Sequence, residues 1–333
     1  GQQLPAFGGL NEFLSAVVAA RLLQAYLSDS QLMAVVACIE LTIPFRAPDA
    51  NGHTAAQRLA QRIQVLCAKL APTLLDKSPP CAAFVKATVN HAVDLANRDV
   101  TGFIEASPEY CLVNSMLLVE ESMMPKAASG EQSLLAYRSA LLGMDTFLSH
   151  LNPACVGQSF ECHPTADVVM QMQATARQNI AFVRGYLAAV LSAVAILEAL
   201  ARSAADSAPM ARSRMGMHCA NAARLQNPTT RPLFHAGLHQ LLKNGLESLE
   251  SPGLSALPLA ACIYEFLGQG RTEQTLQQAR QMFGGTVSPP EFLRSLNRDM
   301  VCAVIRDAAE TESPRNEALM ALAHSLYTHH AMN

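Results

Sequence analysis

The sequence predicts an all-α protein, an irregular multi-helix globular bundle around one long central hydrophobic helix at about 165–205. Three observations support this prediction. Ala, Leu, Met and Gln are prominent, and no long run alternates apolar and polar residues as a strand would. Prolines and glycines separate apolar segments of helical length. With 50% hydrophobic and 15% charged residues, the chain can also bury a large core.

The segment 165–205 has no proline and repeats apolar or small residues at alternating three- and four-residue spacing. The seam consists of Val169, Ala176, Ile180, Val183, Leu187, Val190, Val194, Leu197 and Ala201. Phe182 and Ile196 lie outside the seam, so other helices should cover this one on most sides. The uncharged stretch between Arg184 and Glu198 is shorter than the roughly 20 residues that cross a bilayer. We therefore expect a core helix and no membrane span.

The N-terminal half predicts helices that begin at capping residues or prolines and end before prolines. Asn11 caps the first, Pro44 ends the second, Pro80 opens the fourth and Pro125 closes the fifth. The expected ranges are 11–27, 30–43, 54–70, 80–97, 107–123 and 131–151, with a short piece at 99–105.

The C-terminal half continues in the same way, with turns that contain proline or glycine between apolar segments. Helices are expected at 210–225, 232–249, 257–267, 272–283, 289–309 and 314–330. Their lengths vary and no fixed period relates them, which favours an irregular bundle over a solenoid.

For the domain organisation, we expect an N-terminal arm at 1–9 and a single all-α domain at 10–333. The stretch 152–164, NPACVGQSFECHP, is the longest irregular connection in the middle of the chain and the candidate subdomain boundary. A single domain is preferred because the long helix that follows needs packing partners from both sides of this connection.

The nine cysteines are scattered and odd in number, and most stand within apolar helical patterns, as Cys38 and Cys262 do. This usage is typical of reduced core residues and predicts an intracellular protein, cytoplasmic or nuclear. The net charge of −3 argues against a generally basic nucleic-acid binder.

The most unusual local feature is the segment 207–246, which contains no Asp or Glu. Its candidate partner-binding residues are Arg212, Arg214, His218, Arg224, Arg231 and Lys243. Such a basic surface predicts an acidic protein partner, because Arg pairs well with carboxylates. A nucleic-acid backbone is the second choice, since only Phe234 is available for base stacking. Alternatively, acids from elsewhere in the fold pair with these bases.

His235 and His239 stand four residues apart, the spacing at which a helix presents two imidazoles to a metal. The glutamate of the HExxH pattern is missing between them. We therefore expect no metal site and no cofactor, and we interpret the two histidines as surface or hydrogen-bonded residues.

The sequence lacks the GxGxxG, GxxxxGK[ST] and GxSxG motifs and resembles no known family. We therefore favour a non-enzymatic protein–protein interaction module, an adaptor, scaffold or regulatory effector, that uses the basic surface at 207–246. The first alternative is an enzyme or small-molecule-binding helical protein with a pocket near His218, His235 and His239. The second is a nucleic-acid-backbone binder. The oligomeric state stays open.

Overall fold

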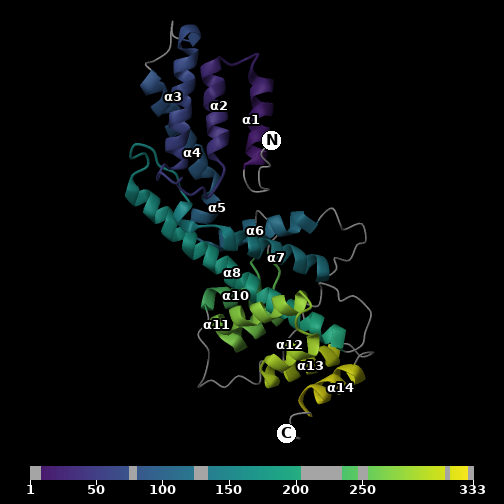
Figure 1. The fold of residues 1–333 in the computed structure, drawn as a ribbon. Coiled ribbons are helices and arrows are strands. Elements are labelled where there is room, and N and C mark those ends of the chain that lie inside the picture. Colours follow the sequence, from purple (N-terminus) through teal and green to yellow (C-terminus); the bar gives the residue numbers. More distant parts are fainter. Residues whose placement is uncertain are drawn as a thin grey trace. The chain divides into compact units, whose positions relative to one another are not determined.

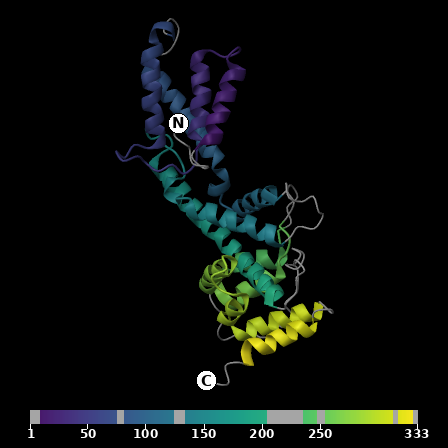
Figure 2. The ribbon, with the colours of Figure 1, turned by 45° about the vertical axis from the view of Figure 1, so that its right-hand side comes forward.

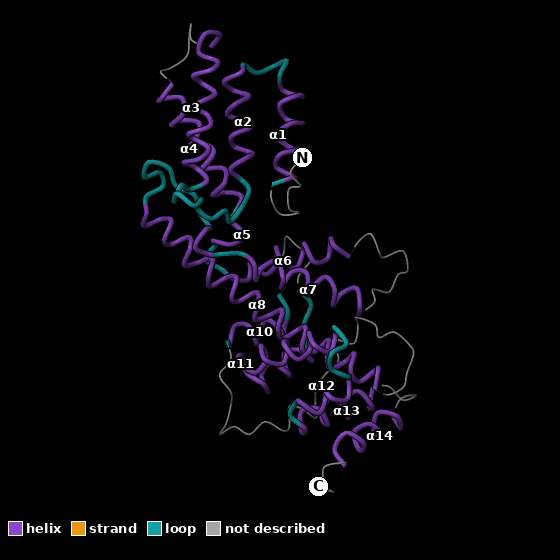
Figure 3. Tube along the Cα trace, in the orientation of Figure 1, coloured by secondary structure: helices purple, strands orange, loops and turns teal. Residues whose placement is uncertain are grey.

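The computed structural model describes residues 9–74, 81–123, 134–203, 235–246, 254–311 and 316–328. These ranges contain helices and loops without a strand, as Figure 3 shows, which confirms the all-α fold class. The elements are α1 (Leu10–Leu23), α2 (Asp29–Leu41), α3 (Ala55–Leu74), α4 (Cys81–Asp99), α5 (Thr101–Ile104), α6 (Pro108–Met123), α7 (Leu134–His150), the 3-10 helix η2 (Pro153–Cys155), α8 (Ala166–Ser203), α10 (Ala236–Asn244), α11 (Pro258–Phe283), α12 (Pro289–Ser295), α13 (Arg298–Thr311) and α14 (Asn316–Thr328).

The chain divides into two compact units, each formed by two separate segments. The first unit contains Gly1–Cys111 and His150–Ile180, and the second contains Leu112–Ser149 and Ala181–Asn333. The three divisions fall inside α6, before the last residue of α7 and inside α8, whereas the candidate boundary at 152–164 lies within the first unit. The single domain at 10–333 and the arm at 1–9 remain predictions.

In the first unit, α2, α3 and α4 pack around a common apolar core, and α1 lies beside α2 at the edge (Figures 1 and 2). The core is built from small and branched side chains, which let the helices approach closely. Its most deeply buried members are Ala37, Leu41, Ala55, Ala56, Ile63, Val89, Ala92 and Val93. Residues with helical spacing on α3 and α4 thus face inward together, as their apolar patterns predict.

Side-chain amides hold two irregular stretches of the first unit, the connection between α7 and α8 and the end of α5. Asn97 on α4 donates from Nδ2 to the carbonyl of Gln158 at 3.0 Å and accepts the Gln158 N–H at 2.7 Å. Asn179 on α8 donates to the carbonyls of Phe103 and Glu105 at 2.9 and 2.8 Å. These bonds satisfy backbone groups that have no partner in a helix ladder, so the connection is an ordered part of this unit.

The long hydrophobic helix predicted at about 165–205 is confirmed as α8, which has 38 residues. In the second unit its side chains are almost fully enclosed, with Leu187, Leu191 and Ile196 at 0% exposure. By length and composition α8 is apolar enough to cross a membrane, but 89% of its most apolar window is buried in the fold. This burial supports its interpretation as a core helix.

The second unit also contains a buried carboxylate that pairs with two arginines. Asp145 on α7 has a 4% exposed side chain and receives Arg184 Nε of α8 at its Oδ1, 3.2 Å away. Arg280 of α11 pairs with the other carboxylate oxygen, Oδ2. One carboxylate therefore connects α7, α8 and α11, with both of its oxygens engaged.

Around α11 to α13, one predicted break is present and one predicted helix is divided. The ranges 257–267 and 272–283 correspond to the two helical parts of α11, which meet at a kink where Gly268 adopts φ 71°. The range 289–309 is divided into α12 and α13, because Leu296 is extended and Asn297 Oδ1 accepts the Met300 N–H at 3.1 Å. A side-chain cap of this kind starts a new helix.

The helix predicted at 232–249 is shorter in the structure. His235 precedes α10 as its N-cap, and Gly245 ends it with φ 74°. A Cβ on Gly245 would lie 2.4 Å from the carbonyl oxygen of Leu254, so this turn requires glycine. The helix predicted at 210–225 lies outside the described residues.

Candidate interaction surfaces

Most of the basic segment predicted to bind a partner lies outside the described residues. This applies to Arg212, Arg214, His218, Arg224 and Arg231. Lys243 is described, and it is exposed near the end of α10. The basic surface at 207–246 therefore remains a prediction.

His235 and His239 take different positions from those that a metal-binding helix would give them. His235 lies before α10. Its ring atom Nδ1 accepts the backbone N–H of Leu238 at 3.2 Å, and the backbone N–H of His235 donates to the hydroxyl of Tyr264 at 3.0 Å. Its ring meets Phe182 edge to face, with centroids 5.3 Å apart. The expectation that both imidazoles share one helical face is wrong, because His235 serves as the cap of the helix.

His239 is inside α10 and faces an acid of α11. Its Nε2 lies 3.3 Å from Glu265 Oε2, and its side chain is 11% exposed. Within the described ranges, no three or more His, Cys, Asp and Glu residues gather closely enough to hold a metal ion. The two histidines thus stabilise the start and the packing of α10.

Helix α1 presents a continuous apolar surface to solvent. Large side chains recur at helical spacing, and Phe13, Val18 and Leu22 are 58%, 54% and 68% exposed. We name this surface the α1 stripe, and its members are Leu10, Phe13, Leu14, Val17, Val18 and Leu22 of the helix, with Tyr26 in the turn that follows it. The opposite face of α1 carries small residues, including the buried Ala16, and packs beside α2. The helix is therefore apolar on both sides, and the described residues cover only one of them.

The α1 stripe carries a single charge. Arg21 is exposed and follows Val17 by four residues, which places it on the same face as the stripe. Glu12, the other charged residue of α1, is half-buried on the packed side. Burial raises the pKa of Asp99, and the charge of Glu12 raises it further, so these two acids lie near each other. No carboxylate of α1 is thus directed toward Arg21.

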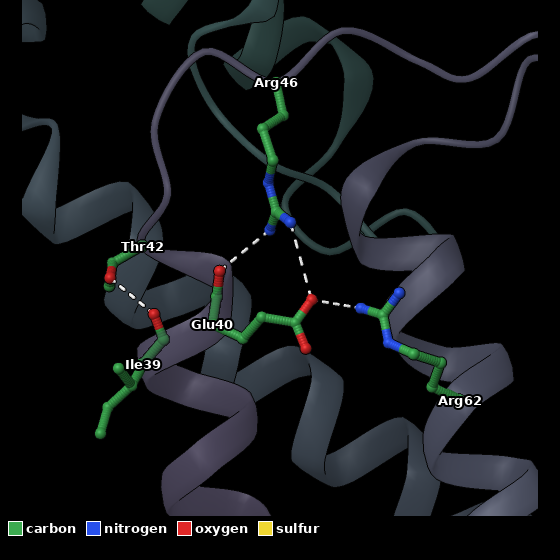
Figure 4. Close-up of polar contacts among 5 residues, drawn as sticks. All are labelled: Ile39, Glu40, Thr42, Arg46 and Arg62. Atoms are coloured by element: carbon green, nitrogen blue, oxygen red, sulfur yellow. Dashed lines mark hydrogen bonds and ion pairs between the residues drawn. The ribbon is translucent and has the colours of Figure 1, made fainter. Parts of the chain in front are cut away.

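A second feature of the first unit is a pair of arginines around Glu40 (Figure 4). Arg46 donates from Nη2 to the Glu40 carbonyl at 3.0 Å, and its Nη1 lies 3.6 Å from Glu40 Oε1. Arg62 of α3 pairs with the same carboxylate oxygen. Burial lowers the pKa of Arg46, and the charge of Glu40 opposes this effect. The cluster ties the loop after α2 to α3 and leaves one cation in excess among these three groups.

In the second unit, α6 and α7 enclose a groove of about 350 Å³. Small residues of α7 form much of its wall, and it contains no carboxylate, imidazole or thiol. Its lining comprises Leu118, Val119, Ser122, Met123, Ala136, Ser139, Ala140, Gly143, Met144 and Phe147. Its hydroxyl-bearing residues are Ser122 and Ser139, and the lining holds no carboxylate or imidazole that could act as a general base for them.

Sequence reasoning missed both the α1 stripe and the Glu40 cluster. The stripe was hidden because an apolar helix at the edge of a bundle has the same composition as a buried one. A usable signal was present, however, since apolar residues of α1 cover more than one face of a short helix. Arg62 is distant from Glu40 in sequence, so no local pattern relates them.

Comparison with known proteins gives no assignment to set beside this geometry. No protein-family model matches the chain, no curated protein is similar to it, and no solved structure matches its fold.

Proposed function

We propose that this protein is a non-enzymatic helical interaction module that binds an amphipathic helix of a partner protein along the α1 stripe. The observation that supports this proposal is the row of exposed apolar side chains on one face of α1. Monomeric proteins rarely leave large contiguous apolar patches uncovered, and those that do commonly use them for binding. Anchors at helical spacing suit a helical partner, because two such rows interdigitate along their length.

The partner's chemistry follows from Arg21, which lies on the stripe without a carboxylate of α1 beside it. Covering Arg21 with an apolar surface would bury an unpaired charge, at a cost of several kcal/mol. A partner helix with a carboxylate opposite Arg21 avoids this cost. The acidic partner expected from the sequence is thereby retained, with its contact proposed on α1 rather than on 207–246.

Two other occupants fit the stripe less well. A second copy of the chain offers no acid on its own stripe, and parallel pairing would place Arg21 against Arg21. A membrane surface attracts helices with several Lys or Arg residues beside the apolar face, whereas α1 has Arg21 alone.

Two designed helical peptides with the same aliphatic face test the proposal, one with Glu and one with Lys opposite Arg21. We expect the wild-type protein to bind the Glu peptide about tenfold more tightly in fluorescence anisotropy, because close charge pairs across an interface contribute about this much. Arg21→Glu should reverse the preference. Leu14→Glu should abolish binding of both peptides, since it places a charge within the stripe.

The matched control is Leu66→Glu on α3, which introduces the same charge at another exposed leucine of the first unit. It should leave peptide binding unchanged. Equal binding of the two peptides, or binding that survives Leu14→Glu, would exclude this site. Self-association or vesicle binding of the wild type that Leu14→Glu removes would assign the stripe to a second copy or to lipid instead.

A further inference from the structure

Three arginines gather around one carboxylate beside the N-terminal half of α3 in the first unit. Glu40 Oε1 lies 3.6 Å from Arg46 Nη1 and also pairs with Arg62, so both guanidinium groups contact a single oxygen atom (Figure 4). Arg58 precedes Arg62 by four residues on α3, which places it one turn away on the same face. Three cations therefore lie around the carboxylate of Glu40.

Asp49, in the loop between α2 and α3, offsets this excess only in part. Its Oδ1 accepts the backbone N–H groups of Asn51 and His53 at 2.9 Å each, and its Oδ2 lies 3.6 Å from His53 Nδ1. The His53 N–H lowers the pKa of Asp49 most, and the charge of Arg58 adds a smaller part. Asp49 is thus bound chiefly to its own loop, and even with its charge counted the group keeps one cation in excess.

The arginines also retain hydrogen-bond donors for a further anion. Arg62 uses Nη2 for Glu40 and is 51% exposed, so its Nε and Nη1 groups remain for another acceptor. The Nε of Arg46 is buried without a hydrogen-bond partner. Burial lowers the pKa of Arg46 most, and the like charges of Arg58 and Arg62 lower it further. The first turn of α3 has no acid, so the positive end of the helix dipole adds to this field.

We propose that Arg58 and Arg62 bind a phosphate group, either free or carried on a small ester, while Arg46 beside them adds positive charge. Guanidinium groups bind oxyanions through paired N–H bonds, and side chains four residues apart on a helix can converge on one group. Phosphate offers more acceptor oxygens than a carboxylate and can carry two charges, which suits three guanidinium groups. The site is on α3 and does not depend on the α1 stripe.

Isothermal titration calorimetry of the full chain tests the proposal, with inorganic phosphate and glycerol phosphate as probes and ionic strength held constant with sodium chloride. We expect Arg58→Gln to weaken the binding of both probes about tenfold, since a charge-assisted hydrogen bond contributes about this much. Glu40→Gln should tighten binding severalfold, because it removes the acid that competes for Arg62. Equal affinities for the two probes would assign the site to phosphate itself, and tighter binding of glycerol phosphate would assign it to an ester.

A matched control is Arg98→Gln, which removes an exposed arginine of the first unit on α4 and should leave both affinities unchanged. Circular dichroism checks that Glu40→Gln, which loses an ion pair, stays folded. Arg58 forms no ion pair within the described ranges, so Arg58→Gln decides the question if Glu40→Gln unfolds. Failure of both probes to bind at millimolar concentration, wild-type affinity in Arg58→Gln, or weaker binding by folded Glu40→Gln would overturn the inference.

Discussion

Glu198 of α8 is a largely buried acid in the second unit, and its side chain is 13% exposed. Arg138 of α7 pairs with its Oε2, and the same guanidinium lies over the ring of Phe283, 4.5 Å from the centroid. Burial raises the pKa of Glu198, while the charge and hydrogen bond of Arg138 lower it, and burial prevails. The pair therefore positions two helices and an aromatic ring at some cost in desolvation.

The raised pKa of Glu198 gives a stability dependence of defined sign. Because the folded protein holds this proton more tightly than the unfolded chain, the free energy of unfolding falls as pH rises from the ordinary glutamate pKa of 4.5 through the raised pKa. Glu198→Gln removes the titration. We expect the difference in unfolding free energy, wild type minus variant, to decrease between about pH 4 and pH 7 in urea titrations.

Glu291 supplies the contrasting control, because hydrogen bonds from Ser288 at the start of α12 lower its pKa. The contribution of Glu291 to stability is present above the ordinary glutamate pKa and is lost as pH falls through the lowered pKa. Glu291→Gln should therefore change the pH profile in the opposite sense. Parallel profiles for the two variants would contradict the environments described for both carboxylates.

Among the elements, helix identity was predictable from the sequence, while several ends were not. Proline and glycine between apolar segments located α2, α4, α6 and α8 to within a few residues. The break at Asn297 depends on the hydrogen bond that its side chain accepts from a backbone N–H. Other residues nearby could cap a helix in the same way, so the sequence alone does not locate this break. The candidate site was less predictable, since exposure of the α1 stripe depends on which helices pack beside α1.

The kink in α11 gives a prediction for two glycines of one helix. Gly268 has φ 71° and ψ 171°, a conformation that other residues strongly avoid. Gly268→Ala should therefore lower the free energy of unfolding by about 1–3 kcal/mol. Gly270 has open space where a Cβ would stand, so Gly270→Ala should raise it by up to about 1 kcal/mol in the same denaturant titration. Similar effects from both substitutions would mean that α11 is not kinked at Gly268.

For the whole molecule, α8 contributes to both compact units, because the division between Ile180 and Ala181 falls within it. The high hydropathy of α8 is consistent with either a core helix or a membrane-spanning helix, and its burial in the fold favours the core helix. Helical periodicity alone identified this helix in the sequence. The two-unit organisation was not predictable, because it depends on which distant segments assemble around each half of α8.

The core assignment of α8 can be measured with two leucines of the second unit. Leu191 is fully buried on α8, whereas Leu135 on α7 is 57% exposed. Leu191→Ala should lower the free energy of unfolding by about 2–5 kcal/mol, because it leaves a cavity in a packed interior. Leu135→Ala should change it by no more than about 0.5 kcal/mol. Comparable small effects would place Leu191 at a loosely packed surface instead.

The discontinuity of the first unit has a consequence for synthesis on the ribosome. A domain made of one segment can fold as soon as that segment emerges, but this unit also requires His150–Ile180. The nascent chain must therefore extend beyond Leu112–Ser149, which belongs to the second unit, before the first unit has all its parts. During that interval Val100 lacks Val156 and Ala176, the buried residues that pack with it in a small apolar cluster, so the order of translation itself determines when this cluster can close.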